Sequence, residues 1–315
     1  MSSEPAVFDL RPLTIGEILD RAVTLYIRNF APLTLIMLFA LIPTSLARYY
    51  TMQNSAAFYG ALLQQISGAP GHKPSPAKIN KALESSPALG AASVAALVFA
   101  IFVLPFANVG IALGVAMVYD ARRVDVRLAV LGALRRWPAV LLMGIFEMLA
   151  ILVWGVAGGL IFGILAVFGV AVGIALPGLR VAGIILLALA LLAWLLTFVP
   201  LLLAVLLSFC AIGIEHVPAP RAFVQGLART YNRAHFKRTM LVSLAFLAIQ
   251  AGSVVAVIVG QAISLLILKS ALFETVVTTL LSMVSAAFLS VAVAVYYYDL
   301  RVRLEGLDLR ISAPA

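Results

Sequence analysis

Six long apolar runs constrain what this chain can fold into. They cover, approximately, residues 31–50, 89–118, 138–176, 181–214, 239–268 and 272–298. Each run is long enough to cross the hydrocarbon core of a bilayer, which takes roughly 20 helical residues. The sequence therefore predicts an all-α fold, a polytopic transmembrane helical bundle of about six spans.

The rest of the chain leaves no room for a separate soluble domain. Hydrophobic residues make up 63% and charged residues 11% of the sequence, and the mean hydropathy is +1.11, far from soluble globular domains. We expect a single integral membrane domain over 1–315, with a cytoplasmic helix in 1–30, the bundle over 31–298 and a cytoplasmic tail over 299–315. Because the third and fourth runs are long for one perpendicular helix, eight spans are the alternative.

The basic residues predict how the bundle is oriented. Cytoplasmic flanks retain Lys and Arg, and alternate polar segments of this chain hold 16 of its 22 basic residues. Both termini are therefore expected in the cytoplasm, in a multi-pass protein of the plasma membrane. The net charge of +9 fits contact with anionic lipid headgroups, whereas nucleic acid would need a clustered basic surface that the sequence lacks.

The polar segment ahead of the first run has the pattern of an interfacial helix. Thr14 and Glu17 have the capping-box spacing, so a helix should begin at Thr14. Beyond it, polar residues recur at helical spacing and apolar residues cover the remaining surface. Residues 124–137 and 220–238 have a comparable pattern ahead of the third and fifth runs. We infer a threefold unit, that is, a unit repeated three times along the chain. Each copy is made of a cytoplasmic amphipathic helix and a transmembrane hairpin.

The last helix should extend beyond its apolar run. Opposite charges four residues apart favour a helix that continues until Gly306 ends it. This extension and the N-terminal helix lie on the same predicted side of the membrane, and we hypothesise that they dock through ion pairs. The hypothesis pairs Arg21 or Arg28 with Asp299 or Glu305, and Glu17 or Asp20 with Arg301 or Arg303. The alternative is that these charges meet only water and headgroups, where exposed pairs contribute about 0–1 kcal/mol.

Both ends of the chain resemble a known group of sequences. The likeness is carried by the N-terminal RPLTIGEILDR, with the following LY and RNF, and by the C-terminal YYDLR, with the following R and EGLDL. These segments resemble bacterial membrane proteins related to the membrane domain of glycerophosphoryl diester phosphodiesterases, whose activity is generally uncharacterised. The resemblance implies a six-helix protein of the bacterial inner membrane.

The catalytic barrel of those phosphodiesterases has no counterpart in this sequence. The histidines are His72, His216 and His235, and no metal-ligating or acid/base cluster accompanies them. The enzyme chemistry therefore does not carry over, and we expect neither a cofactor nor a metal.

Two polar residues within the apolar runs are candidate substrate or proton sites. Glu147 lies roughly 15 Å into its run, near the predicted middle of the membrane, where a carboxyl group is costly. The alternative for Glu147 is a neutral carboxyl group hydrogen-bonded to a neighbouring helix. Asn108 follows Pro105, and a proline kink there could open a polar pocket of the kind that transporters use.

Glycines spaced four residues apart predict close helix packing, because small residues on one stripe let two backbones approach. The stripes are Gly110 and Gly114; Gly155, Gly159 and Gly163; and Gly169 and Gly173. A homodimer seam or a flexible gate is the functional alternative.

Three classes of function remain open. A non-enzymatic scaffold or accessory component of a membrane complex is favoured, because the best-defined features are interfacial helices. A small-molecule or lipid transporter would need a polar path through the bundle to Glu147, Asn108, Gln250 or Gln261. A lipid-modifying enzyme would need clustered acidic or histidine residues, and Glu215 with His216 is the one adjacent pair. The expected partners are membrane lipids, other membrane proteins or a second copy of the chain.

Overall fold

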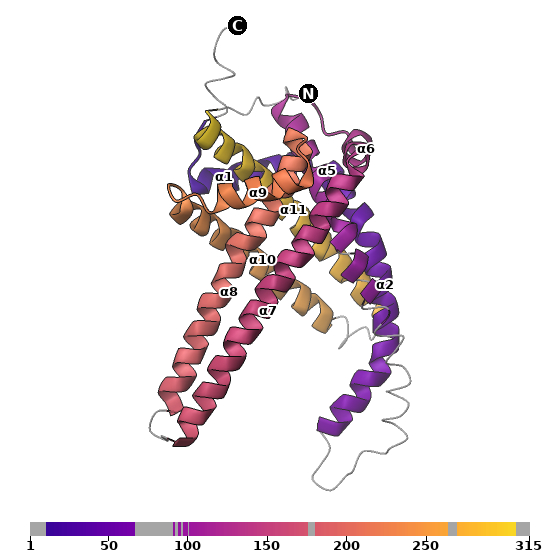
Figure 1. Ribbon diagram of the computed structural model, residues 1–315. Coiled ribbons are helices and arrows are strands. Elements are labelled where there is room, and N and C mark those ends of the chain that lie inside the picture. The colour runs from indigo at the N-terminus through magenta and orange to yellow at the C-terminus, as the bar shows by residue number, and fades with distance from the viewer. Residues whose placement is uncertain are drawn as a thin grey trace.

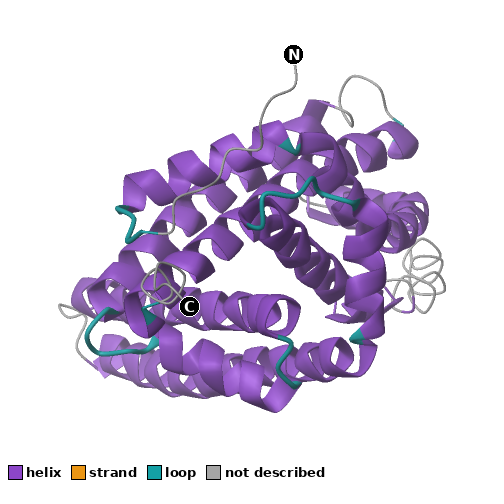
Figure 2. Cartoon of the chain, turned by 90° about the horizontal axis from the view of Figure 1, so that it is seen from above, coloured by secondary structure: helices purple, strands orange, loops and turns teal. Residues whose placement is uncertain are grey.

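The computed structural model describes residues 11–66, 91, 94–95, 97–99, 101–175, 180–263 and 270–306. Within these ranges the regular structure is helical, with no strand (Figure 1 and Figure 2). Six helical segments are long and apolar enough to cross a membrane: Phe30–Ala47, Leu97–Tyr119, Trp137–Leu165, Gly183–Glu215, Phe236–Ile263 and Leu272–Glu305. They match the six apolar runs, which confirms the predicted all-α polytopic bundle.

A short helix recurs three times along the chain, each time ahead of two spans. The elements are α1 (Ile15–Arg28), α2 (Phe30–Ile66), α5 (Leu104–Tyr119), α6 (Val126–Arg135), α7 (Trp137–Ala175), α8 (Arg180–Cys210), the π-helix η2 (Ala211–Glu215), α9 (Ala219–Thr230), α10 (Phe236–Ile263) and α11 (Ala271–Glu305). Each of the short helices α1, α6 and α9 precedes a pair of spans, as the threefold unit requires. That the short helices are amphipathic elements of the membrane surface stays a prediction.

The third and fourth apolar runs each form one helix, so the described residues contain six candidate spans rather than eight. α7 and α8 pack as a hairpin that extends away from the other helices (Figure 1). Trp154 of α7 stacks on Trp194 of α8 with ring centroids 3.9 Å apart, and its indole N–H donates to Thr197 Oγ1 at 3.0 Å. These aromatic contacts fix the register of the hairpin.

Two helix limits differ from those that the sequence indicated. α2 continues past the end of the first apolar run, near residue 50, to Ile66. The second span is interrupted at Val103, and Pro105 lies in the first turn of α5 instead of kinking a continuous helix. Proline has no amide hydrogen to donate and fits the first turn, where that donor is not needed.

α11 is the central helix of the bundle. It contacts α1, α2, α5, α8 and α10, and residues 291–298 are all buried. Alanine and valine fill most of this stretch, so neighbouring helices can approach closely. Its end packs through Tyr298, which stacks on Tyr119 of α5 with centroids 4.1 Å apart. α11 is therefore buried among other elements from residue 291 as far as Leu300, and its last turn is half-buried.

The glycine stripes behave in two different ways. Cβ atoms added at Gly110 and Gly114 would lie 3.0 and 3.1 Å from side chains of α2, so these glycines do permit close packing. Gly155, Gly159 and Gly163 have no neighbouring atom within 4 Å of such a Cβ, which contradicts their predicted role in packing within the chain. The surroundings of Gly169 and Gly173 lie outside what the structure describes.

The contact with α8 is made instead by Gly158. Successive residues of an α-helix point in directions about 100° apart, so Gly158 lies on a different face of α7 from Gly159. A Cβ at Gly158 would lie 1.8 Å from the Trp194 ring. Glycine at this position lets the indole lie directly against the α7 backbone.

Gly158→Ala should therefore weaken the α7–α8 hairpin. The added methyl group must displace the Trp194 ring and disturb its stack on Trp154, a clash of the kind that costs about 1–3 kcal/mol. We expect a lower melting temperature in detergent and a shifted tryptophan emission. Gly159→Ala is the matched control, since its Cβ meets open space. Equal behaviour of the two variants would contradict this packing.

Candidate functional site

One end of the bundle contains two clusters of buried charges, and the first is centred on Arg229 of α9. We call it the Arg229 cluster: Glu215, Arg229, Tyr297, Arg301 and Glu305. The Arg229 guanidinium donates to Glu215 Oε1 at 2.7 Å, to Glu305 Oε1 at 2.6 Å and to the Tyr297 hydroxyl at 2.6 Å. Arg229 as a whole is only 8% exposed to solvent. Three acceptors from two other elements thus meet at one arginine.

Local packing brings Arg229 to this position. A Cβ at Gly226, one turn earlier in α9, would lie 2.3 Å from the Ala204 carbonyl oxygen of α8. Only glycine allows α9 to lie this close to α8, and Arg229 then reaches the end of α11. The conformation is fixed further because the guanidinium lies over the Tyr297 ring, 4.8 Å from its centroid.

The charges in the Arg229 cluster balance. Arg301 Nε lies 3.2 Å from Glu215 Oε1 and 3.0 Å from Glu305 Oε2, so two arginines face two carboxylates. The Tyr297 hydroxyl donates to Glu215. Burial alone would lower the pKa of Arg229, but the oxygens of Tyr297 and Glu215 raise it above its ordinary value. The guanidinium therefore stays charged, and its function here is to bind the carboxylates.

The second cluster is centred on Asp299 of α11, whose side chain is fully buried. We call it the Asp299 cluster: Leu13, Arg238, Asp299 and Arg303. The carboxylate accepts from the Leu13 amide at 2.7 Å, from Arg238 of α10 at 2.7 Å and from Arg303 at 3.1 Å. The Leu13 carbonyl accepts from the same two arginines, at 2.6 and 2.7 Å. The residue that precedes the α1 cap is thus tied to α10 and α11.

Both clusters are organised by the periodicity of α11. Tyr297, Arg301 and Glu305 recur every four residues and share one face, whereas Asp299 and Arg303 share another. The first face binds η2 and α9, and the second binds α10 and the chain before α1. One helix end thus holds η2, α9 and α10 through ion pairs and the chain before α1 through a hydrogen bond.

The capping box at the start of α1 is confirmed. The Glu17 amide donates to the Thr14 hydroxyl at 3.3 Å, and the Glu17 carboxylate accepts from the Thr14 amide at 2.7 Å. Arg11, whose guanidinium lies 2.6 Å from that carboxylate, and the Thr14 donors lower the pKa of Glu17 to about 2. Glu17 therefore stabilises the start of α1 and is not paired with α11.

The docking of the two ends is observed, but within the described residues Glu17, Asp20 and Arg28 form none of the predicted ion pairs with α11. α1 packs on α11, and the ion pairs of Asp299 and Glu305 are made with arginines of α9, α10 and α11. Asp20 and Arg28 are exposed. Arg21 lies close to Tyr119. The pairings of Arg301 with Glu305 and of Arg303 with Asp299 follow the predicted spacing within α11.

The two predicted intramembrane sites are not brought together. Asn108 accepts a hydrogen bond from Ser290 of α11 at 2.8 Å, so its amide belongs to a helix seam. Glu147 is half-buried in α7 and makes no hydrogen bond or ion pair within the described residues. Its neighbour Phe146 packs on Phe223 of α9, with centroids 5.5 Å apart.

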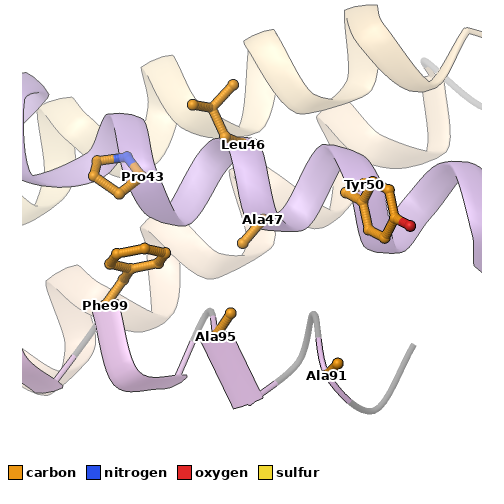
Figure 3. A pocket seen from close by; sticks show the side chains of 7 residues that line it. All are labelled: Pro43, Leu46, Ala47, Tyr50, Ala91, Ala95 and Phe99. Atoms are coloured by element: carbon orange, nitrogen blue, oxygen red, sulfur yellow. The ribbon is translucent and has the colours of Figure 1, made fainter. Parts of the chain in front are cut away.

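Two cavities of the described residues are not lined by Asn108 or Glu147. The first cavity, of about 610 Å³, lies between α2 and the residues Ala91, Ala95 and Phe99. Apart from the Tyr50 hydroxyl, the side chains that line it are apolar (Figure 3). Its lining residues are Pro43, Leu46, Ala47, Tyr50, Ala91, Ala95 and Phe99. A second cavity, of about 310 Å³, is lined by Val103 and by apolar residues of α2, α5 and α6. Both suit hydrocarbon better than a polar substrate.

Sequence reasoning missed Glu215, Arg229 and Arg238 as members of the site. The sequence offered three weak signals. Glu215 is a carboxylate directly at the end of an apolar run, and no acidic residue lies between it and α10, so the arginines there lack a local partner. Tyr297, Arg301 and Glu305 recur every four residues. Within the described ranges, no group of three His, Cys, Asp or Glu side chains is placed to hold a metal ion.

Comparisons with family models, with curated proteins and with solved structures found no match to this chain. The resemblance of its two ends to the phosphodiesterase-related membrane proteins therefore stays a prediction.

Proposed function

We propose that this chain is a non-enzymatic integral membrane protein that acts as a scaffold or accessory component of a membrane complex. The observation that supports this most is that the buried charges bind one another. In the Arg229 cluster two arginines neutralise two carboxylates, and in the Asp299 cluster the carboxylate and the Leu13 backbone bind two arginines. Catalysis or transport needs polar groups that a substrate can reach, whereas a scaffold needs a surface of fixed shape.

The fixed surface would include the outer faces of the three short helices. Ile27 of α1, Leu128 of α6 and Val224 of α9 are 68%, 57% and 63% exposed. At the predicted cytoplasmic surface these side chains would enter the headgroup layer or contact another membrane protein. The proposed location is the bacterial plasma membrane with both termini in the cytoplasm, supported by the distribution of basic residues.

Transport is the second candidate, and one observation favours it. Glu147 is a carboxyl group within a candidate span, without a partner among the described residues, and such groups often bind protons or ions. No cavity described above reaches it, so the scaffold is the better supported function.

Glu147→Gln separates the two candidates. Glutamine keeps the shape and hydrogen-bonding capacity of the side chain but cannot ionise, so a scaffold should tolerate it fully. We would complement a deletion strain with tagged wild type or variant, purify each from mild detergent, and quantify the copurifying proteins and lipids. Met148→Leu is the matched control, because Met148 is the exposed neighbour on α7.

The expected result is the same cellular phenotype and the same stoichiometric protein partner for wild type and both variants. Loss of the phenotype at unchanged abundance with Glu147→Gln alone would reject the scaffold in favour of proton-linked transport. A chain that restores the phenotype but purifies without any protein partner would also contradict the scaffold function.

A further inference from the structure

A cavity of about 440 Å³ opens where the ends of α5, η2 and α11 meet, beside the Arg229 cluster. We call it the α5–α11 pocket. Its lining combines apolar, aromatic and basic side chains, among them Leu113, Met117, Arg122, His216, Tyr298 and Arg301. The pocket is thus amphiphilic, unlike the two apolar cavities.

Two unusual backbone positions border this pocket. Ala121, with φ of 56°, and His216, with φ of 59°, are the non-glycine residues with left-handed backbone in the described part of the chain. Ala121 lies between the lining residues Asp120 and Arg122, and His216 is itself a lining residue. Left-handed backbone is disfavoured for residues with a Cβ, and such positions cluster at ligand sites.

The wall of the pocket is a π-helix that is held firmly in place. The Gly213 carbonyl of η2 accepts a hydrogen bond from Arg136 at 3.0 Å, and Glu215 is bound in the Arg229 cluster. π-Helical turns are rare and occur frequently at functional sites. The rim of the pocket is therefore preorganised, which lowers the cost of binding a ligand.

Two guanidinium groups of this pocket have donors to offer. Arg301 uses its Nε for the carboxylates of the Arg229 cluster, and its two terminal nitrogens make no hydrogen bond within the described residues. Arg122 is exposed and pairs with Asp120, at 2.7 Å, in a contact that water screens. An anion with several acceptor oxygens can displace Asp120 and bridge these donors, as phosphate does with arginine forks.

We propose that the α5–α11 pocket binds a phosphate group, as carried by the headgroup of an anionic phospholipid. The two arginines bind the phosphate oxygens, and Leu113 and Met117 provide an apolar surface for the adjoining chain. The same phosphate chemistry could come from a soluble phosphate, and the experiment distinguishes the two sources. The inference does not depend on the proposed scaffold function.

The test uses the full purified chain in detergent, with phosphatidylglycerol, phosphatidylcholine or inorganic phosphate as the probe. Binding is measured by native mass spectrometry and by the rise in melting temperature. We expect phosphatidylglycerol to bind, and phosphatidylcholine to bind much more weakly because its choline cation neutralises the phosphate and is repelled by the two arginines. Arg122→Gln should weaken phosphatidylglycerol binding by about tenfold or more, as expected for the loss of a charge-assisted hydrogen bond.

Two further variants keep the test decisive. Arg127→Gln, at an exposed position of α6 outside the pocket lining, should bind as wild type does. His216→Gly removes the imidazole from the pocket lining, and glycine suits the left-handed backbone, so the ligand-free protein should be as stable as wild type. Binding should weaken because the pocket loses a polar group that can donate to the phosphate.

Binding of inorganic phosphate with the same dependence on Arg122 would support the phosphate site and assign it to a soluble ligand. Equal binding of phosphatidylglycerol by wild type, Arg122→Gln and His216→Gly would overturn the proposal, as would equal binding of the two phospholipids by wild type.

Discussion

Arg229→Met should destabilise the protein more than loss of any exposed charge on the same helix. Methionine has nearly the volume of the arginine stem, but it leaves the Glu215 carboxylate without its closest cation and removes the donor to Tyr297. Removing one partner of a buried ion pair costs about 3–5 kcal/mol, because the other charge stays buried without compensation. We expect a large fall in the melting temperature in detergent.

Two further variants identify the cause of that loss. Arg221→Met removes an exposed charge two turns earlier on α9, and its melting temperature should be close to that of wild type. In Arg229→Met, Arg301 alone faces two carboxylates; adding Glu215→Gln removes one of them, so the double variant should recover part of the stability. If Arg229→Met and Arg221→Met melt alike, the Arg229 cluster is not a buried ion-pair network.

The spans could be predicted because each depends on a single segment of sequence. A run of apolar residues defines its own helix whatever lies beside it, and Thr14 with Glu17 or Gly306 defines a helix end from neighbouring residues alone. The ion pairs within α11 are equally local, since a four-residue spacing places Asp299 beside Arg303 on any helix.

The pairings between helices could not be predicted from the same information. Arg238 and Asp299 are 61 residues apart, and they meet only because α10 has a particular rotation relative to α11. The contact of Leu13 with Asp299 uses backbone atoms, which carry no residue-specific signal. Both facts depend on packing that hydropathy does not encode.

The glycines of α7 illustrate the same limit. A four-residue spacing selects Gly155, Gly159 and Gly163, but the face that packs on α8 is the one with Gly158, opposite Trp194. Spacing identifies which glycines share a face, and the partner helix decides which face is used.

Asp299→Asn should release the N-terminal helix from the bundle. Asparagine has one acceptor oxygen in place of two and no charge, and its amide would face donors from Arg238, Arg303 and the Leu13 amide. Two arginines would then lack their only carboxylate in the Asp299 cluster. Removing one partner of a buried ion pair lowers the free energy of unfolding by about 3–5 kcal/mol. Hydrogen exchange of the α1 amides should become much faster than in wild type.

The matched control is Asp20→Asn, which makes the same chemical change at an exposed position of α1. It should leave hydrogen exchange unchanged, because the face of α1 that packs on the bundle consists of Ile18, Ala22, Leu25 and Tyr26. Equal exchange rates in the two variants would show that apolar packing alone holds α1. Faster exchange confined to Asp299→Asn would show that a buried carboxylate on α11, and not a pair of surface charges, joins the two ends of the chain.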